Sequence, residues 1–546
     1  MPAGRVRGVR TRCSSNGSLE ELPQKVDCKL RFTYKTNMRE FSRRSFLRRA
    51  AAGVALAAPG VNRLAAFGRE RGANDTIGVA VIGLRGRGQS HLHSIATTKG
   101  LRLVAVCDVD PAVLAENVRT AERRGDKVRA FADVRKVLEC ADVDAVTIAT
   151  PNHWHSLMGI WACQAGKDVY IEKPVSHHLW EGRMLVEAAR KHGRIVQTGT
   201  QARANPDVIE ALRWLRAGNL GAVRHAHGMC YKPRMSIGKS GRGEIPAGLD
   251  YDLWAGPAPL RPLTRKNLHY DWHWIHDYGN GDLGNQGIHE MDLSRWFLGH
   301  TALSPQVMSI GGRLGYDDDG ETPNTQLVWH AYDGPPILFE VRGLPKAKQY
   351  QADAALWSKN MDVSAGFSGN WSVGVTVVCE GGRLIIEGGG QALLALDPQN
   401  KIIKRFEQKD PQRGVGWSKG DAHIFENWLA IMRSRTAAEQ SAPILDGHLS
   451  SGLCHTGMIS HRLGRTARPE EILERIRADR LASEHFAAMK EHLERNGVDL
   501  AKPGLVLGPS LAFDPASERF TNNDAANALL RRADRKPFVV PEIASA

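Results

Sequence analysis

The sequence has no cysteine and histidine spacing typical of zinc sites, no long apolar run, and no basic tract in its main part. No C-x-x-C pair occurs, so we predict reduced, structural cysteines and no metal site. The apolar run that follows residue 49 is too short for a transmembrane helix, and we predict no stable membrane insertion. The eight cysteines are at positions 13, 28, 107, 140, 163, 230, 379 and 454.

Positive charge is concentrated at the N-terminus. Residues 1–50 contain 13 Lys or Arg and 4 Asp or Glu, which accounts for +9 of the net charge of +14 and leaves +5 for the other 496 residues. No basic stripe interleaved with aromatic residues occurs in the main part, which argues against a nucleic-acid partner. A length of 546 residues favours two hydrophobic cores rather than one.

The N-terminal region has the layout of an export signal. Residues 42–48 read S-R-R-S-F-L-R, and a run of small apolar residues extends from position 50 to 58. This pattern predicts a twin-arginine signal peptide over residues 38–66 and a periplasmic or otherwise exported protein. A chance pairing of arginines in a basic leader is the alternative. Residues 1–37 are patternless, and we expect them to be disordered or to precede a true start at Met38.

A glycine turn follows the first regular strand. Residues 77–82 form an apolar run that leads directly into G-L-R-G-R-G at 83–88, and a helical stretch follows. A second apolar run, residues 101–107, ends at Asp108. Strand, glycine turn, helix, strand and acid in this order are typical of a dinucleotide-binding βαβ unit. The middle position of the turn is Arg85 instead of the usual glycine.

Each residue of this turn has an expected part in holding the dinucleotide. Gly83 permits the tight turn, Gly86 or Gly88 allows close approach of the backbone, and the pyrophosphate lies on the helix N-terminus. Asp108 is placed to accept hydrogen bonds from the adenosine ribose, which favours NAD. Two nearby cations could offset repulsion of a 2′-phosphate, so NADP stays open. These cations are Arg85 and Arg87.

Two further strands end in polar motifs. The run 143–149 leads into T-P-N-H-W-H at 150–155, and the run 168–171 leads into E-K-P at 172–174. Ligands of doubly wound sheets bind at the carboxyl ends of the strands, so we expect both motifs near the nicotinamide ring. The residues expected to contact the cofactor there are Thr150, Asn152, His155, Glu172 and Lys173.

The combination of these motifs with a later one resembles the Gfo/Idh/MocA family. The later motif is G-D-L-G-N-Q-G-I-H-E-M-D at residues 281–292. The resemblance covers roughly residues 76–465. It implies an α/β protein with an NAD(P)-binding Rossmann domain over residues 75–200 and a substrate domain over 201–465. The second domain would be built on a large, open, mostly antiparallel sheet, and the protein would form a homo-oligomer. Residues 466–546 form a further extension, first helical and then rich in proline.

The resemblance also implies catalytic residues. Lys173 would contact both the nicotinamide and the substrate hydroxyl, and His289 would be the general base. Asn285 departs from the family pattern, since many relatives have Asp there. An asparagine one helical turn before the histidine can contact the substrate or orient the imidazole, but it cannot share a proton. Asp292 belongs to the same substrate motif.

Other polar and aromatic residues are candidates for sugar binding. Aromatic faces next to polar groups suit sugar rings, although plain packing is an equal alternative, and Arg203 follows G-T-Q at the domain junction. The histidines at 423, 448 and 455 do not have a metal-binding spacing, and we expect them to be structural. The aromatic substrate-site candidates are Tyr231, Trp272, His273 and Trp274.

These features predict an oxidoreductase that transfers hydride between NAD and a sugar or polyol. Free NAD is not expected outside the cytoplasm, so an exported enzyme would keep its cofactor and regenerate it in each turnover. Transient oxidation of a sugar, followed by cleavage and return of the hydride, meets the same condition and would make the protein an NAD-dependent glycosidase or lyase. A third hypothesis is a non-catalytic protein that senses a sugar or dinucleotide. Asn285 is compatible with this hypothesis, because many relatives have Asp at that position.

Overall fold

The computed structural model describes residues 76–544 except 240, 242, 352–371 and 408–415. The predicted leader at 1–37 and the predicted twin-arginine signal peptide at 38–66 lie outside the described residues. Within the described part, no helix combines the length and apolar content needed to cross a bilayer.

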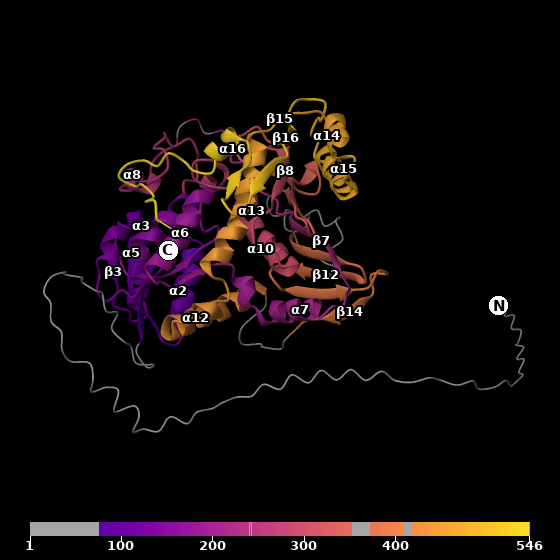
Figure 1. The fold of residues 1–546 in the computed structure, drawn as a ribbon. Coiled ribbons are helices and arrows are strands. Elements are labelled where there is room, and N and C mark those ends of the chain that lie inside the picture. The colour runs from indigo at the N-terminus through magenta and orange to yellow at the C-terminus, as the bar shows by residue number, and fades with distance from the viewer. Residues whose placement is uncertain (1–75, 240, 242, 352–371, 408–415, 545–546) are drawn as a thin grey trace, which may run out of the picture. The chain divides into compact units, whose positions relative to one another are not determined.

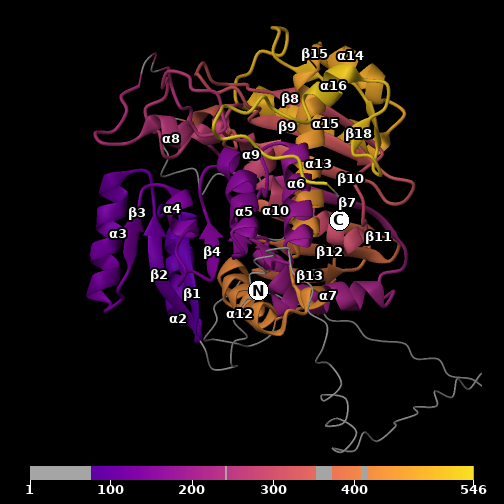
Figure 2. The same ribbon diagram turned by 60° about the vertical axis from the view of Figure 1, so that its left-hand side comes forward.

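Residues 77–198 contain a six-stranded parallel sheet in the order β3-β2-β1-β4-β5-β6, with helices on both faces (Figures 1 and 2). Apolar residues cover both faces of its central strands, which explains why these strands read as continuous apolar runs. The strands are β1 (Ile77–Ile82), β2 (Leu101–Cys107), β3 (Arg129–Phe131), β4 (Ala145–Ile148), β5 (Asp168–Ile171) and β6 (Val196–Thr198). The helices are α2 (Arg87–Thr97), α3 (Pro111–Arg123), α4 (Val134–Leu138), α5 (His155–Gln164) and α6 (Leu179–Lys191).

A second sheet of twelve strands follows. Its main path is β14-β13-β12-β11-β7-β10-β9-β8-β16-β15, and its pairs are antiparallel except for β7 with β10. The predicted fold class, a Rossmann domain followed by a mostly antiparallel α/β domain, is confirmed. The strands are β7 (Val223–Cys230), β8 (Gln306–Gly312), β9 (Thr325–Ala331), β10 (Ile337–Arg342), β11 (Val373–Cys379), β12 (Gly382–Glu387), β13 (Ala392–Leu396), β14 (Ile402–Arg405), β15 (Arg465–Thr466), β16 (Val506–Leu507), β17 (Leu511–Asp514) and β18 (Arg519–Phe520).

Different helices cover the two faces of this sheet. Because side chains alternate along a strand, Phe339 of β10 packs with α10 (Gly287–Leu298) and α13 (Ile444–Arg462), whereas Leu338 faces the other way. The outer face of β8, β9 and β10 is covered by α14 (Pro469–Ile476) and α15 (Arg480–Arg495). Figure 1 shows α13 and α15 on either side of β8. The helical part of the C-terminal extension is therefore one layer of the second domain.

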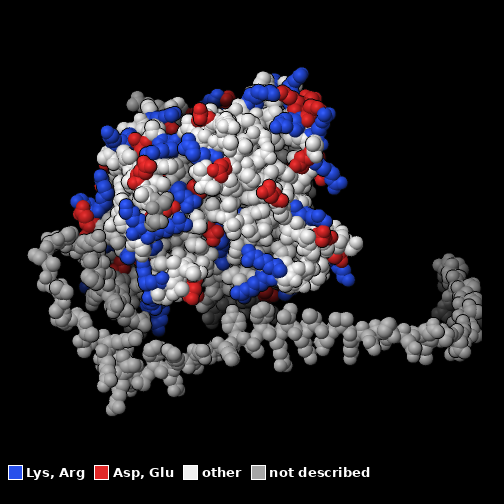
Figure 3. Space-filling view, in the orientation of Figure 1, with Lys and Arg blue, Asp and Glu red and all other residues white. Residues whose placement is uncertain are grey.

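The chain also returns to the first sheet. Helix α12 (Gly416–Ser434) packs Ile424, Phe425 and Trp428 into the core beneath the Rossmann strands, next to α2. The two domains are thus linked by packing as well as by the chain between them. On the face in Figure 3, acidic and basic residues are interspersed, with no continuous basic stripe. The remaining helices are α7 (Pro206–Arg216), α8 (Tyr251–Ala255), α9 (Gly281–Asn285) and α16 (Asp524–Ala528).

Glu518 connects the extension to the rest of the fold. Its carboxylate accepts hydrogen bonds from Arg183 Nε of α6 at 3.1 Å and from His448 Nε2 of α13 at 2.9 Å. Burial opposes ionisation of this carboxyl, but His448 and Arg183 outweigh burial and lower the pKa of Glu518 to about 2. The ionised form is therefore preferred in the folded protein.

We expect Glu518→Gln to destabilise the protein near neutral pH by about 2 kcal/mol and to have little effect near pH 2. A depressed carboxyl pKa stabilises the fold above the unfolded value near 4.5, and this contribution disappears as the pH falls toward 2. Urea unfolding of both proteins at several pH values measures the difference. An equal penalty at every pH would mean that the charge of Glu518 is not what holds the extension.

Candidate functional site

The glycine turn after β1 allows very close packing. Gly83 has φ of 83°, and a Cβ on it would lie 2.6 Å from the carbonyl oxygen of Ala149. A Cβ on Gly88 would lie 2.0 Å from the carbonyl oxygen of Gly83. By contrast, a Cβ on Gly86 would meet no atom within 4 Å, since this residue borders a cavity. The N-terminus of α2 is thus presented to open space, as a pyrophosphate requires.

Asp108 lies at the carboxyl end of β2 and also lines this cavity. Its carboxylate accepts backbone N–H groups from Leu84 at 2.9 Å and Asp110 at 3.0 Å, while burial raises its pKa. Two backbone hydrogen bonds leave further lone pairs on the carboxylate for ribose hydroxyls. The position fits the expected role in binding the adenosine ribose.

The two arginines of the turn have different environments. Arg85 is exposed at the cavity. The side chain of Arg87 donates to Glu172 Oε1 at 3.0 Å and makes a bidentate pair with Asp421 at 2.9 and 3.0 Å. Because these carboxylates already neutralise Arg87, it offers little compensation for a 2′-phosphate next to Asp108. The contacts of Arg87 therefore favour NAD over NADP, whereas Arg85 stays at the cavity.

The Glu172 carboxylate holds the glycine turn in place through Arg87 and His91. Burial opposes its ionisation, but Arg87 and His91, whose Nε2 is 3.1 Å from Oε1, hold the pKa of Glu172 well below its usual range. A Cβ on Gly199 would lie 2.9 Å from the same oxygen, so the G-T-Q segment also packs against this carboxylate. Glu172 lines the cavity, yet its charge serves to fix Arg87.

Lys173 connects the two domains inside the cavity. Its Nζ donates to the backbone carbonyl of Asn285 at 2.9 Å, and both residues line the same cavity. Burial lowers the pKa of the Lys173 ammonium below its usual range, although the charge of Glu172 acts in the opposite direction. The structure thus brings the E-K-P motif and the 281–292 motif together.

His289 lies in the first turn of α10 and is buried. Burial, and next the positive charge of Lys173, lower its pKa well below the usual range, so the imidazole is neutral. It lies beneath the cavity and is not among the residues that line it. The charge of Lys173 therefore disfavours a proton on His289.

The motif at 150–155 forms part of the cavity wall. Asn152 donates through Nδ2 to Asn280 Oδ1 at 2.9 Å. The ring nitrogens of His155 lie 2.6 Å from the carbonyl oxygen of Pro174 and 2.7 Å from that of Thr150. These contacts fix the ends of β4 and β5 relative to each other. Thr150, Asn152 and His155 all border the cavity, as expected.

An aromatic wall faces the glycine turn. Trp272 and His273 are stacked, with ring centroids 3.7 Å apart and planes 20° apart, and both line the cavity. Trp274 lies outside it, borders a second hollow and packs beneath the guanidinium of Arg234 at 5.5 Å. The cavity has a volume of about 410 Å³. It is within the usual range for sites that bind small molecules.

Besides Trp274, three predicted substrate residues do not line the cavity. Arg203 and Asp292 form a buried ion pair, with Nε 2.8 Å from Oδ2, and Arg203 also reaches Asp446 at 2.9 Å. The hydroxyl of Tyr231 donates to Glu340 Oε2 at 2.6 Å, away from the cavity. Their tertiary partners are distant in the chain, so the sequence could not indicate these roles. The substrate contacts predicted for them are not supported by their positions.

Several cavity residues were not predicted. They come mainly from the loops between β7 and α10, where no regular pattern marks them. Arg234 forms a bidentate pair with Asp282 at 2.7 and 2.9 Å, which raises its pKa despite burial. The only sequence feature that pointed to these loops was the aromatic candidates within them, Tyr231 and residues 272–274. The additional lining residues include Lys232, Arg234, Trp254, His269, Tyr270 and Gln286.

Comparisons with known proteins agree with this architecture. Residues 77–200 match the family model GFO_IDH_MocA, described as an oxidoreductase family with an NAD-binding Rossmann fold. Residues 223–353 match the model of the same family's C-terminal alpha/beta domain. The WlbA dehydrogenase of Chromobacterium violaceum, solved with NADH and UDP-GlcNAcA, has a TM-score of 0.51 and 20% identity. That alignment covers 71% of this chain and 95% of the other. It supports the fold alone.

Two curated relatives match in sequence. Glycosyl hydrolase family 109 protein 2 of Shewanella sp. (strain ANA-3) is 31% identical over 207 residues, which are 34% of this chain and 45% of the relative. Inositol 2-dehydrogenase 2 of Saccharopolyspora erythraea is 27% identical over 264 residues, which are 46% of this chain and 65% of the relative. The chain thus spans between about half and two thirds of these relatives. Residues 77–200 and 223–353 of the chain are thus each similar to a domain of the GFO_IDH_MocA oxidoreductase family.

Proposed function

We propose that this protein is an NAD-dependent oxidoreductase that transfers hydride between the nicotinamide and a hydroxyl-bearing carbon of a sugar or polyol. The observation that carries the proposal is one continuous cavity. It extends from the glycine turn and Asp108 to Lys173, Asn285 and the stacked Trp272 and His273. Inositol 2-dehydrogenase among the relatives supports a polyol or sugar substrate.

The residues of the cavity divide the work of such a reaction. Bound NAD supplies the hydride acceptor. The ammonium of Lys173 has three donors, of which one is used by the Asn285 carbonyl, so others can orient a substrate hydroxyl. His289 is neutral and can accept a proton from Lys173 as Lys173 takes the proton of the substrate hydroxyl. Asn285 takes no part in proton transfer.

The second candidate is redox-neutral cleavage of a glycoside, favoured by the relatives named for glycosyl hydrolase family 109. Removal of hydride from one sugar carbon makes the neighbouring C–H acidic, and loss of that proton expels the glycosidic oxygen. Water then adds to the resulting double bond, and the hydride returns to the ketone. The net reaction is hydrolysis, and the cofactor ends in its original state.

We also propose that the protein is exported by the twin-arginine route as a homo-oligomer with its cofactor bound. The S-R-R-S-F-L-R segment at 42–48 supports export, and the family resemblance supports oligomerisation. An exported protein of this kind cannot draw on free NAD. Tight retention of the dinucleotide is the consequence, and both candidate reactions are compatible with it.

Purification without added nucleotide tests this function. We expect the folded protein to carry about one equivalent of NAD(H), visible in its absorption spectrum and in the nucleotide released on denaturation. Asp108→Ala should lower the affinity for NAD(H) by about 10- to 100-fold, since hydrogen bonds from the ribose to a charged carboxylate are lost. An empty protein that needs added NAD for turnover would contradict retention. A protein that binds no dinucleotide at all would contradict the oxidoreductase proposal and favour a non-catalytic role.

A further inference from the structure

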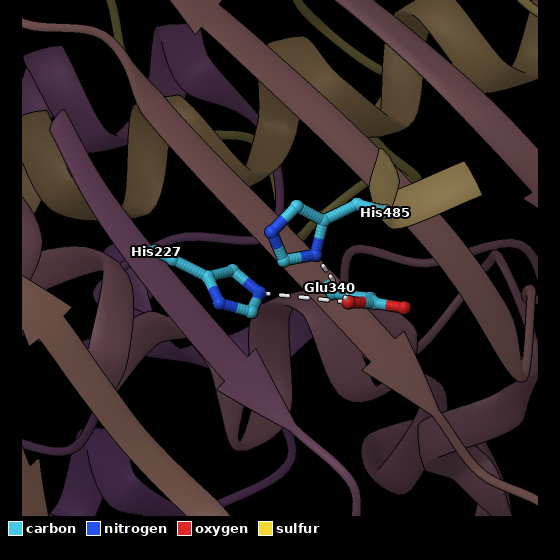
Figure 4. Close-up of side chains that lie close together, drawn as sticks. All are labelled: His227, Glu340 and His485. Atoms are coloured by element: carbon cyan, nitrogen blue, oxygen red, sulfur yellow. Dashed lines mark hydrogen bonds and ion pairs between the residues drawn. The ribbon is translucent and has the colours of Figure 1, made fainter. Parts of the chain in front are cut away.

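Three potential metal ligands meet on the outer face of the large sheet. They are His227 of β7, Glu340 of β10 and His485 of α15, shown in Figure 4. Glu340 alternates with Phe339, which packs on the opposite face against the layer that contains α10. The cluster is therefore separated from His289 and the dinucleotide cavity by the thickness of the sheet. None of its residues has a part in the proposed oxidoreductase reaction.

The spacing of the ligand atoms suits one metal ion. Glu340 Oε2 is 3.5 Å from His227 Nε2 and 3.2 Å from His485 Nδ1. All three atoms lie within 4.8 Å of one another. Ligands about 2.0–2.1 Å from a tetrahedral zinc ion are about 3.3 Å apart. Two of the three separations are therefore close to those of an ideal site, and small side-chain rotations would adjust the third.

The environment of His227 also suits metal binding, since only 6% of its side chain is exposed. Its Nε2 is buried and has no hydrogen-bond partner among the described residues, because 3.5 Å to Glu340 is too long for a good hydrogen bond. Buried polar atoms normally have a partner. A metal ion bound between the imidazoles would provide one.

The surroundings of Glu340 orient its carboxylate. Arg342 Nε donates to Oε1 at 2.6 Å, and the hydroxyl of Tyr231 donates to Oε2 at 2.6 Å. Such contacts to a ligating carboxylate are typical of metal sites and direct Oε2 toward the imidazoles. The positive Arg342 opposes a divalent cation nearby, so the affinity should be moderate. His485 is partly exposed, with 18% of its side chain accessible, which leaves a path for the ion.

We propose that His227, Glu340 and His485 bind one divalent transition-metal ion, with water as a further ligand, and that this ion fastens α15 to the sheet. Two imidazoles and one carboxylate suit zinc and similar ions, whereas magnesium and calcium prefer oxygen ligands alone. The proposal reverses the expectation of no metal site, which the sequence favoured because these three residues come from distant segments. Its expected role is structural, since α15 covers the outer face of β8, β9 and β10.

Two substitutions of His485 distinguish a metal ligand from a hydrogen-bond donor. His485→Asn retains an N–H donor toward Glu340 but loses a good metal ligand, whereas His485→Cys retains a metal ligand and loses the strong donor. The full protein is purified, treated with a chelator and titrated with Zn²⁺ or Co²⁺. Metal content, the visible absorption of bound Co²⁺ and the melting temperature are measured. Glu484→Ala, an exposed neighbour on α15, is the matched control.

We expect one equivalent of Zn²⁺ in the wild type, Glu484→Ala and His485→Cys, with a raised melting temperature. His485→Asn should bind at least about 100-fold more weakly, since loss of even an outer partner costs 10- to 100-fold. If neither ion binds the wild type, or if His485→Asn binds as well as the wild type does, the proposal is wrong. Bound dinucleotide, measured in parallel, should not differ between these proteins, which separates this outcome from a failure of the oxidoreductase proposal.

Discussion

Replacing Lys173 with alanine is expected to lower turnover by about 10³-fold, within the range for loss of a group that transfers or stabilises a proton. Lys173 is the cavity residue at which the dinucleotide half and the 281–292 motif meet, through the 2.9 Å bond from Nζ to the Asn285 carbonyl. The glycine turn and Asp108 remain intact in the variant, so the dinucleotide should stay bound. Turnover is measured with free sugars, polyols and nitrophenyl glycosides, together with the nucleotide content.

The choice of substrate in this experiment separates the two candidate reactions. Hydride exchange between sugars changes the redox state of both substrates, whereas redox-neutral cleavage releases nitrophenol with no net change. Both should fail in Lys173→Ala. Lys136→Ala is the control, because Lys136 is exposed on α4 and pairs only with Glu139 in the described structure. Wild-type rates in Lys173→Ala would contradict the site.

A His289→Ala variant, alone and combined with Lys173→Ala, tests whether Lys173 and His289 act in one proton transfer. If Lys173 and His289 pass the same proton, the double variant should be little slower than the slower single variant, because the two substitutions remove one function. Independent roles would instead give multiplied losses. The charge of Lys173 is the second-largest contribution to the depressed pKa of His289, after burial, which is why we expect the first outcome.

Much of the Rossmann half could be predicted because its signals are local. The strands predicted at 77–82, 101–107 and 168–171 have the bounds observed for β1, β2 and β5. Each is an apolar run buried on both faces, and each ends at a polar motif whose position at the strand end places it in the cavity. In this type of sheet the ligand binds at the carboxyl ends of the strands. The order of strands and polar motifs in the sequence was therefore sufficient to place the motifs at the site.

The roles of individual charged residues were harder to predict, because they depend on partners far along the chain. Arg87 is adjacent to the glycine turn, but Asp421, 334 residues later, binds its guanidinium. The hydroxyl of Tyr231 is bound by Glu340, 109 residues later. Likewise, α14 and α15 could be predicted as charged helices, whereas their position on the outer face of the sheet depends on tertiary packing. The spacing of residues along the sequence does not predict these long-range contacts.

Arg203 also has a role set by partners far along the chain. Replacing it with methionine should destabilise the protein by about 3–5 kcal/mol. The guanidinium contacts both oxygens of Asp292 at 2.8 and 3.0 Å and one oxygen of Asp446 at 2.9 Å. Only 4% of the Arg203 side chain and 2% of the Asp292 side chain are exposed. Methionine keeps the apolar packing on Trp296, whose ring lies 5.0 Å from the guanidinium carbon, but leaves Asp292 charged and buried. Urea unfolding measures the loss.

The matched control and a second variant show whether the charge causes this loss. Arg190→Met removes an exposed arginine that pairs with Glu187, and it should cost less than about 1 kcal/mol. Adding Asp292→Asn to Arg203→Met removes the buried charge that has lost its nearest cation, and it should recover part of the stability. If Arg203→Met is as stable as the wild type and instead raises KM, Arg203 contacts the substrate, as the sequence alone predicted. Because Asp292 and Asp446 already bind the guanidinium, we expect the loss of stability.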